Sequence, residues 1–325
     1  MQSLIVFLVG VLTLAAIYAA LAMVLNLVAG WAGMWDLGVA GLVAVAAYTY
    51  IIVTQTKVGS GLWFAPGWPM ATGIVAAVAV TSVAALIVAL PAIRLRGEYF
   101  LITTLAFAEV IHQLIISEDK LTRGATGFSS IDRPLSDLVP ASDYRWVLLG
   151  LALAVALGVY LLTNRLSKTP FVRVLRASRD NEAVARSLGK NVVRYRIVTY
   201  VLAGALIAVI TPLYLWHVRS VVPSLFVSEL TFVVWTALVV GGMASRRGPV
   251  IGATLLIVCT ELLTFLQGSA EYAQILAATR PLILGLLLVL VLRFRPEGLS
   301  SERSAFRFSE ADLLPDKTSE TKAVP

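Results

Sequence analysis

The sequence predicts an all-α, polytopic membrane helix bundle of about eight to ten spans. Hydrophobic residues make up 58% of the 325 residues and charged residues only 14%, and the mean hydropathy is +0.86. A soluble domain is usually about 45–50% apolar and about 25% charged, so a soluble enzyme of this length is excluded. A spanning helix needs roughly 20 apolar residues, and the apolar residues of this chain divide into runs of about that length.

Nine apolar runs follow one another along the chain. The first is too long for the apolar core of a signal peptide and has no basic segment before it, so we interpret it as a spanning helix. We expect residues 1–295 to form one transmembrane domain and the polar residues 296–325 to form a disordered cytoplasmic tail. The runs are 4–29, 34–54, 70–92, 98–116, 146–163, 197–216, 225–243, 249–266 and 276–293.

The charge distribution predicts the orientation of the chain. The net charge is +7, and cytoplasmic loops of membrane proteins are enriched in Lys and Arg. The loop 164–196 carries nine of these residues and is predicted to be cytoplasmic, as are the connections at Arg94 and Arg246 and the C-terminus after Arg293. The side of the N-terminus stays open. The predicted outer connections are 55–69, 117–145, 217–224 and 267–275.

Two glycine-rich joints interrupt the apolar pattern. Residues 30–41 contain four glycines and Asp36, and residues 241–248 contain three glycines. The first joint fits either a plain loop or a broken, re-entrant helix. Irregular backbone survives at membrane depth only where it is buried in protein or lines a watery cavity. Gly248 and Gly252 have the GxxxG spacing, which favours close packing of two helices.

Soluble-enzyme motifs are absent from the sequence, including phosphate-binding loops, dinucleotide-binding loops and the zinc motif H-E-x-x-H. Two histidines and the lone Cys259 make no metal cluster, and we expect no metal and no cofactor on this chain. The high content of Lys and Arg is explained by membrane orientation, so we expect no nucleic-acid partner.

Ionisable residues within the apolar runs are candidates for the translocation path, because a charge in the bilayer needs a partner or a function. Glu109 and His112 share one helical face, which Thr104 could extend. A cavity-lining stripe and a structural polar cluster are both compatible with this pattern, and Glu261 leaves the same alternatives open. Asn26 and Asp36 flank the first glycine joint, where Asp36 could cap the second helix.

The basic loop 164–196 has the pattern of one or two short helices. Pro170 suits a helix start and Gly189 a helix stop. Phe171, Leu175 and Leu188 belong to a broken amphipathic pattern that also includes Val174, Val184 and Ala185. Such a segment could bind anionic lipid or dock a soluble partner. The polar Asp-Asn-Glu turn at 180–182 favours docking.

The segment Arg176-Ala-Ser-Arg-Asp-Asn-Glu-Ala-Val-Ala-Arg-Ser-Leu-Gly-Lys-Asn191 resembles the coupling loop of ATP-binding-cassette importer permeases. More specifically, it is similar to the branched-chain amino-acid permease family, LivM-type subunit. Four further stretches agree in the family's order, so that the resemblance spans residues 18–299. They surround Leu25-Asn26-Leu27, Arg94-Leu-Arg-Gly-Glu-Tyr99, Gly248-Pro249 and Phe294-Arg-Pro-Glu-Gly-Leu299.

The resemblance implies a permease subunit of a bacterial inner-membrane importer for branched-chain or other hydrophobic amino acids, and no enzyme. It implies four kinds of partner: a LivH-type permease subunit, two ATPase subunits that use the ATP, a periplasmic binding protein, and the lipid bilayer. It also implies that a set of residues in the loop couples the chain to the ATPase. These residues are Arg176, Arg179, Glu182, Ala183 and Gly189.

The chain departs from the family pattern at both joints. It has Asp36-Leu-Gly-Val-Ala40 where the family usually has Ser-Leu-Gly-His-Ala, and Ala244-Ser-Arg-Arg-Gly-Pro249 where the family usually has Gly-Ser-Leu-Trp-Gly-Pro.

The same family takes urea, amides and aromatic acids, which remain alternative substrates. A proton-coupled secondary transporter using Glu109, His112 and Glu261 is the alternative mechanism. A membrane scaffold without transport is disfavoured by the glycine joints and the carboxylates within the spans.

Overall fold

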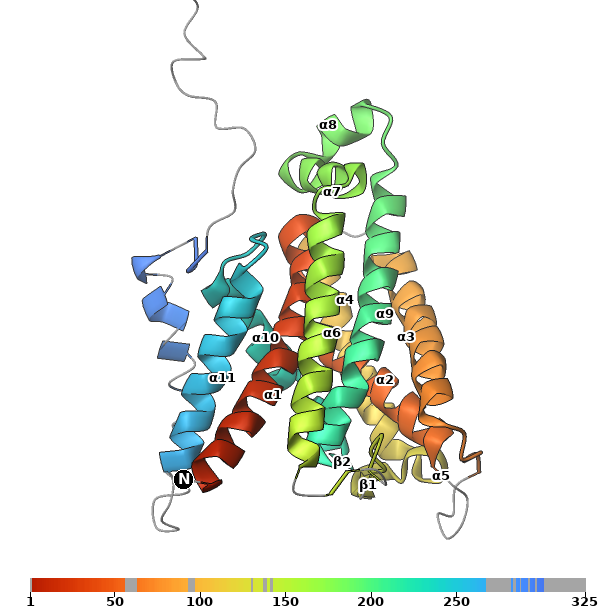
Figure 1. Cartoon of the computed structure of the whole chain (residues 1–325). Helices are drawn as coiled ribbons and strands as arrows, with labels where there is room; N and C mark the ends of the chain where they lie inside the picture. The colour runs from red at the N-terminus through yellow and green to blue at the C-terminus, as the bar shows by residue number, and fades with distance from the viewer. Residues whose placement is uncertain are drawn as a thin grey trace, which may run out of the picture.

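The structure is a computed structural model that describes residues 2–55, 63–92, 97–129, 131–136, 139–140 and 143–266, with parts of 282–300. Eight of the nine predicted runs form helices, and the ninth, 276–293, lies mostly outside the described residues (Figure 1). The helices are α1 (Gln2–Leu25) with its π-helical extension η1 (Asn26–Trp31), α2 (Val39–Thr54), α3 (Met70–Ala92), α4 (Gly97–Ser117), α6 (Tyr144–Leu166), α9 (Val192–Val218), α10 (Ser228–Gly241) and α11 (Gly248–Leu266).

Six helical segments of the described chain are long and apolar enough to cross a membrane, and the helices at Val39–Thr54 and Gly248–Leu262 are shorter but apolar. The predicted all-α polytopic bundle is therefore confirmed. α2 is short because residues 32–38 are not helical, so the run predicted at 34–54 begins five residues late.

The basic loop caps one end of the bundle with α7 (Pro170–Asp180) and α8 (Glu182–Ser187), and we call this the basic end (Figure 1). The opposite end, the loop end, holds the start of α1, α5 (Asp119–Thr122) and η2 (Gly124–Thr126). It also holds an antiparallel pair of strands, β1 (Phe128–Ser129) with β2 (Ser220–Val221), and η3 (Pro223–Phe226). α1 therefore runs from the loop end to the basic end.

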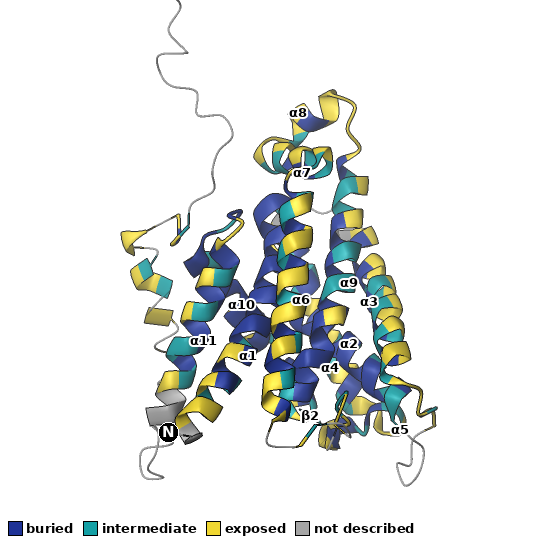
Figure 2. Cartoon of the chain, in the orientation of Figure 1, coloured by how far each residue is buried: buried dark blue, intermediate teal, exposed yellow. Residues whose placement is uncertain are grey.

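The core of the bundle surrounds α1, which packs against α6, α9, α10 and α11 (Figure 2). Its side chains from Ala15 to Leu25 are buried, whereas Leu4 and Leu8 in its first turns are exposed. α3 and α4 lie on the far side of α2 and α9 and present exposed apolar side chains such as Val75 and Ile102. Exposed apolar side chains on these helices are expected of a surface that faces lipid.

The second glycine joint brings α10 and α11 into backbone contact, as the GxxxG spacing predicts. A Cβ atom added to Gly252 would lie 2.0 Å from the carbonyl oxygen of Ala237 and 2.5 Å from the nitrogen of Gly241. Residues 297–300, which we expected in the disordered tail, lie against this joint. The backbone N–H groups of Leu299 and Ser300 donate to the carbonyls of Val240 and Gly241.

We expect Gly252→Ala to destabilise the chain by about 1–3 kcal/mol, because the new methyl group meets backbone atoms that cannot rotate away. Thermal unfolding of the purified protein in detergent measures the effect. Gly158→Ala on α6 is the matched control, since a Cβ atom there has no neighbour within 4 Å. Equal unfolding temperatures for the two variants would contradict this account of the α10–α11 contact.

Candidate functional site

The helical structure is interrupted between η1 and α2, and this interruption forms the centre of the candidate site. We call the non-helical residues 32–38 the broken segment. Leu37 donates its backbone N–H to the hydroxyl of Thr104 at 3.0 Å, and Thr104 is fully buried. Thr104 lies seven residues into α4, which is about 10 Å along the helix. The broken segment therefore lies inside the bundle, and the re-entrant alternative describes it better than a surface loop.

The backbone of the broken segment finds hydrogen-bond partners on α4 and α10. Ala40 at the start of α2 donates its N–H to the hydroxyl of Thr231 at 2.9 Å. The indole N–H of Trp235 donates to the carbonyl oxygen of Asp36 at 2.6 Å, and Trp35 stacks on the same indole at 5.5 Å. These side chains satisfy backbone groups that have no helical partner, as a buried irregular segment requires.

Asp36 is buried and holds the turn that leads into α2. Its Oδ1 accepts the backbone N–H of Gly38 at 2.7 Å and the hydroxyl of Tyr200 at 3.3 Å. A carboxylate that bonds the N–H two residues further on forms an Asx-turn. The expectation that Asp36 caps α2 is wrong in detail, because the N-cap of α2 is Gly38, which has no side-chain cap bond.

Asn26 fastens the two glycine joints to each other. Its Oδ1 accepts the backbone N–H of Ala244 at 2.7 Å, and its Nδ2 donates to the carbonyl of Ser245 at 2.8 Å. The indole N–H of Trp31 donates to the carbonyl of Ala244 at 3.0 Å. A Cβ atom at Gly30 would lie 2.7 Å from the nitrogen of Ala244, so the contact needs glycine. Sequence analysis did not predict that the joints meet.

Arg176 and Arg179 of α7 point into the bundle against the first joint. Nη1 of Arg179 donates to the carbonyl of Gly30 at 2.5 Å, and the guanidinium of Arg176 lies 5.5 Å from the ring centre of Trp31. A Cβ atom at Gly33 would lie 2.7 Å from Cγ of Arg179, and Gly33 has φ +67°. Glycine at position 33 therefore lets the arginine stem pack on the broken segment.

Glu182 and Arg179 are three residues apart, a spacing that would put both on one face of a single helix, but they belong to different helices, α8 and α7. Asn181 is extended (φ −153°, ψ 103°), ends α7 and caps α8 by accepting the N–H of Val184. The carboxylate of Glu182 forms ion pairs with Arg186 at 2.5 Å and with Arg196 at 3.1 Å. Glu182 thus ties α8 to the N-terminal part of α9.

The outer face of α8 exposes an apolar pair, four residues apart. Val184 is 54% exposed and Leu188 71%, whereas Ala185 on the inner face is buried. The amphipathic pattern had grouped all three together, but of the six residues in that pattern only Leu175 and Ala185 are buried. The exposed Ala183 lies beside Val184, and Gly189 with φ +73° ends α8 as predicted.

The polar stripe of α4 is only partly covered by the rest of the described chain, because Glu109 and Gln113 are exposed whereas the side chain of His112 is 15% exposed. The side chain of Glu109 is 57% exposed and its Oε1 lies 3.8 Å from Nδ1 of His112. Gln113 also donates to Glu109, at 3.2 Å. Thr104 does not extend this stripe, because it faces the broken segment. Glu261 is half-buried on α11, which packs against α1 and α10 and so places it apart from the stripe.

Tyr200, Thr231 and Trp235 were missed by sequence analysis, although they hold the broken segment. Each stands within a long apolar run, where a single hydroxyl or indole looks like ordinary core. The one available signal was chemical: a buried Trp or Tyr usually needs a hydrogen-bond partner for its polar atom. That rule does not say which backbone carbonyl or carboxylate serves as the partner.

A bundle of apolar helices with an amphipathic loop at its basic end and a broken helix inside defines a multi-pass membrane protein. A family model described as "Branched-chain amino acid transport system / permease component" matches residues 7–292, and the chain belongs to this family. No solved structure matches the chain.

The chain is similar to proteins named as permeases of branched-chain amino acid transport. It is 30% identical to the high-affinity permease protein LivM of Escherichia coli over 90% of this chain and 69% of that protein. LivM of Salmonella typhimurium is 29% identical with the same coverage. A probable LivH of Methanocaldococcus jannaschii is 26% identical over 60% of this chain and 58% of that protein. The relatives are transport proteins and not enzymes, and the two names indicate a permease pair within a transport system.

We expect Asp36→Ser to be tolerated, because a serine hydroxyl can accept the same hydrogen bond from Gly38. Asp36→Leu leaves the Gly38 N–H and the Tyr200 hydroxyl without their acceptor, at a cost of about 1–3 kcal/mol for each buried group. Thermal unfolding in detergent distinguishes the two variants. A leucine variant as stable as the serine variant would show that the turn does not depend on this acceptor.

Proposed function

We propose that the chain is a transmembrane permease subunit of an ATP-binding-cassette importer for branched-chain or other hydrophobic amino acids. Separate ATPase subunits drive it, and a periplasmic binding protein delivers the substrate. The family and the names of the relatives support this substrate class. The proposal depends most on the arrangement of the basic loop. Its α8 exposes an apolar face to the outside, and its α7 contacts the first joint inside the bundle through Arg179.

The ATPase docks on the outer face of α8. Val184 and Leu188 give this face an apolar centre, and Lys190 and Arg194 are exposed beside it. An exposed apolar pair with a basic rim suits a groove on a partner that has an apolar floor and acidic walls. Ala183 and Gly189 border this face, and because their side chains are small they leave Val184 and Leu188 open to the ATPase. Glu182 acts indirectly, since its ion pairs fix the angle between α8 and α9.

Movement of the docked loop reaches the interior through Arg179 and Arg176. Arg179 bonds the carbonyl of Gly30 and packs on Gly33, and the chain continues directly from there to Asp36. Asp36 in turn contacts Tyr200 on α9 and Trp235 on α10. A shift of α7 therefore acts on α9 and α10 at once, and this movement opens a path.

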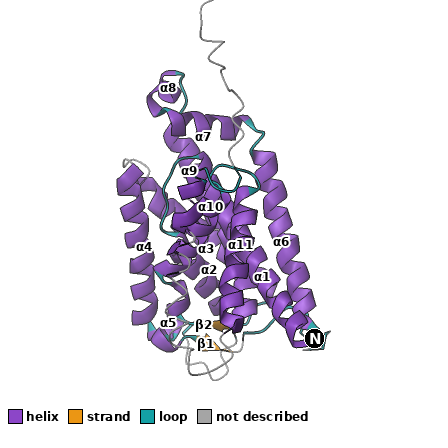
Figure 3. Cartoon of the chain, turned by 90° about the vertical axis from the view of Figure 1, so that its left-hand side faces the viewer, coloured by secondary structure: helices purple, strands orange, loops and turns teal. Residues whose placement is uncertain are grey.

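The second permease subunit covers the polar stripe of α4. Figure 3 places α4 at the edge of the bundle. The side chain of Glu109 on this helix is 57% exposed. An ionised carboxylate facing lipid costs roughly 2.5–3.5 kcal/mol on insertion scales. Protein or water between two permeases removes this cost. The path then runs between the two subunits, along Glu109 and His112, and Asn26, Asp36 and Thr104 hold the moving parts in place.

The basic end faces the cytoplasm of a bacterium, and the C-terminus lies there too. Cysteine labelling can test this orientation at exposed positions. Ser178 in the basic loop is unsuitable for a cysteine replacement, because it is buried and donates its hydroxyl to the carbonyl of Leu175. In a Cys259→Ala background, an impermeant thiol reagent applied to intact cells should label Ser136→Cys at the loop end and miss Lys168→Cys, which is exposed between α6 and α7 and lies outside the docking face. Permeabilised cells should label both. The opposite pattern in intact cells would reverse the orientation.

Leu188→Asp should abolish association with the ATPase subunits, because it puts a charge at the centre of the docking face. Co-purification of tagged ATPase with the chain measures this. Leu135→Asp is the matched control, since Leu135 is 50% exposed at the loop end. Both variants should reach the membrane in wild-type amounts. Normal ATPase recovery with Leu188→Asp would refute docking on α8.

Glu109→Gln should retain most uptake, and that uptake should survive an uncoupler while depending on ATP. Glutamine keeps the hydrogen-bonding capacity of the site but cannot titrate. The proton-coupled alternative requires a carboxyl group that carries protons. Uptake that collapses on adding an uncoupler while cellular ATP stays high would favour the secondary transporter.

A further inference from the structure

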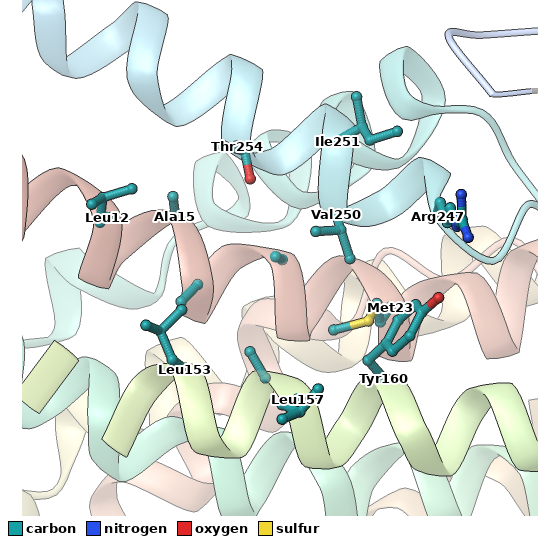
Figure 4. Close-up of a pocket in the computed structure, with 13 residues that line it drawn as sticks. Leu12, Ala15, Met23, Leu153, Leu157, Tyr160, Arg247, Val250, Ile251 and Thr254 are labelled. Atoms are coloured by element: carbon teal, nitrogen blue, oxygen red, sulfur yellow. The ribbon is translucent and has the colours of Figure 1, made fainter. Parts of the chain in front are cut away.

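A groove on the outer surface of the bundle lies between α1, α6 and α11 (Figure 4). Its volume is about 450 Å³, within the range of about 300–1,000 Å³ that is usual for sites of small ligands. Alanines of α1, including Ala15 and Ala19, form its floor, and Leu153, Leu157 and Ile251 form its sides. This lining offers an occupant almost only apolar contacts.

The polar groups of the groove gather toward the basic end of the bundle. Figure 4 shows Arg247 and the phenol of Tyr160 at one end of the groove, beside Met23. Arg247 is exposed, and no carboxylate in the described part of the chain forms an ion pair with it. Arg246, its neighbour, instead donates to the side chain of Asn164 at 3.4 Å. The groove thus combines an apolar body with a cationic head.

The length of the groove matches one leaflet of a bilayer. Its lining on α1 runs from Leu12 to Met23, which is about 16 Å at 1.5 Å per residue. Half of a hydrocarbon core about 30 Å thick is about 15 Å. An extended acyl chain is much narrower than a helix about 10 Å wide, and it fits a groove of about 450 Å³ over this length.

We propose that this groove is a binding site for an anionic phospholipid. One acyl chain lies along the alanine floor of α1, and the phosphate lies against the guanidinium of Arg247 and the hydroxyl of Tyr160. Basic pockets between spanning helices recognise anionic headgroups in this way. The site joins α1, α6 and α11, and its Arg247 belongs to the joint at 241–248, so that a bound lipid contacts this joint directly.

The test uses the full-length chain, purified in detergent with its co-expressed partner subunits and stripped of lipid. Titration with phosphatidylglycerol or phosphatidylcholine, followed by native mass spectrometry, counts the bound lipids. The wild type should bind phosphatidylglycerol about fivefold more tightly, the effect expected of one arginine near a lipid charge. Arg247→Gln should remove this preference, and Arg246→Gln should keep it.

A second pair of variants tests the apolar body of the groove. Ala156→Phe fills it from α6 and should weaken the binding of both lipids, whereas Ala154→Phe, exposed on the same helix outside the groove, should not. Equal affinity of the wild type for both lipids would overturn the proposal. So would an equal loss with Arg246→Gln, or a disulfide between Leu157→Cys and a cysteine on a partner permease, which would show that protein covers the groove.

Discussion

The backbone of the broken segment dominates the architecture of this protein. Between the end of η1 and the start of α2 the chain has no helical hydrogen bonds, yet it lies inside a bundle where water cannot replace them. Backbone groups at and beside this segment therefore need other partners, and Thr104, Thr231 and Trp235 bond Leu37 N–H, Ala40 N–H and the carbonyl of Asp36 from neighbouring helices. Asp36 supplies the turn itself. Four spans are positioned by the same short stretch of irregular chain.

The same constraint explains why the basic loop is more than a cap. The helix ends just after Gly30, so no later residue of the helix donates to the Gly30 carbonyl. Arg179 of α7 donates to it instead. Asn26 meanwhile bonds the backbone of the second glycine joint on both sides. Loop, first joint and second joint therefore form one connected structure at the basic end. Transport proteins need such a structure where an external motion has to move helices without unfolding them.

The sequence predicted those features that depend on composition and local pattern. Run lengths predicted the helices, Pro170 and Gly189 predicted the ends of the loop helices, and the basic residues predicted that the connections 164–196 and 241–248 share an end. The pairing of distant polar groups could not be predicted. Asn26 meets Ala244 across more than two hundred residues, and a lone Thr231 or Trp235 in an apolar run has no local signature. For Glu182, spacing suggested a neighbour on the same helix, and the extended Asn181 broke that helix.

The central claim is that Arg179 transmits the motion of the docked loop to the broken segment. The most direct test is the number of substrate molecules imported per ATP hydrolysed by the reconstituted complex, compared between the wild type and Arg179→Gln. The account predicts that ATPase subunits still bind and hydrolyse ATP while this ratio falls about tenfold or more. A variant that keeps the wild-type ratio would contradict the account, including one in which uptake and hydrolysis fall in parallel.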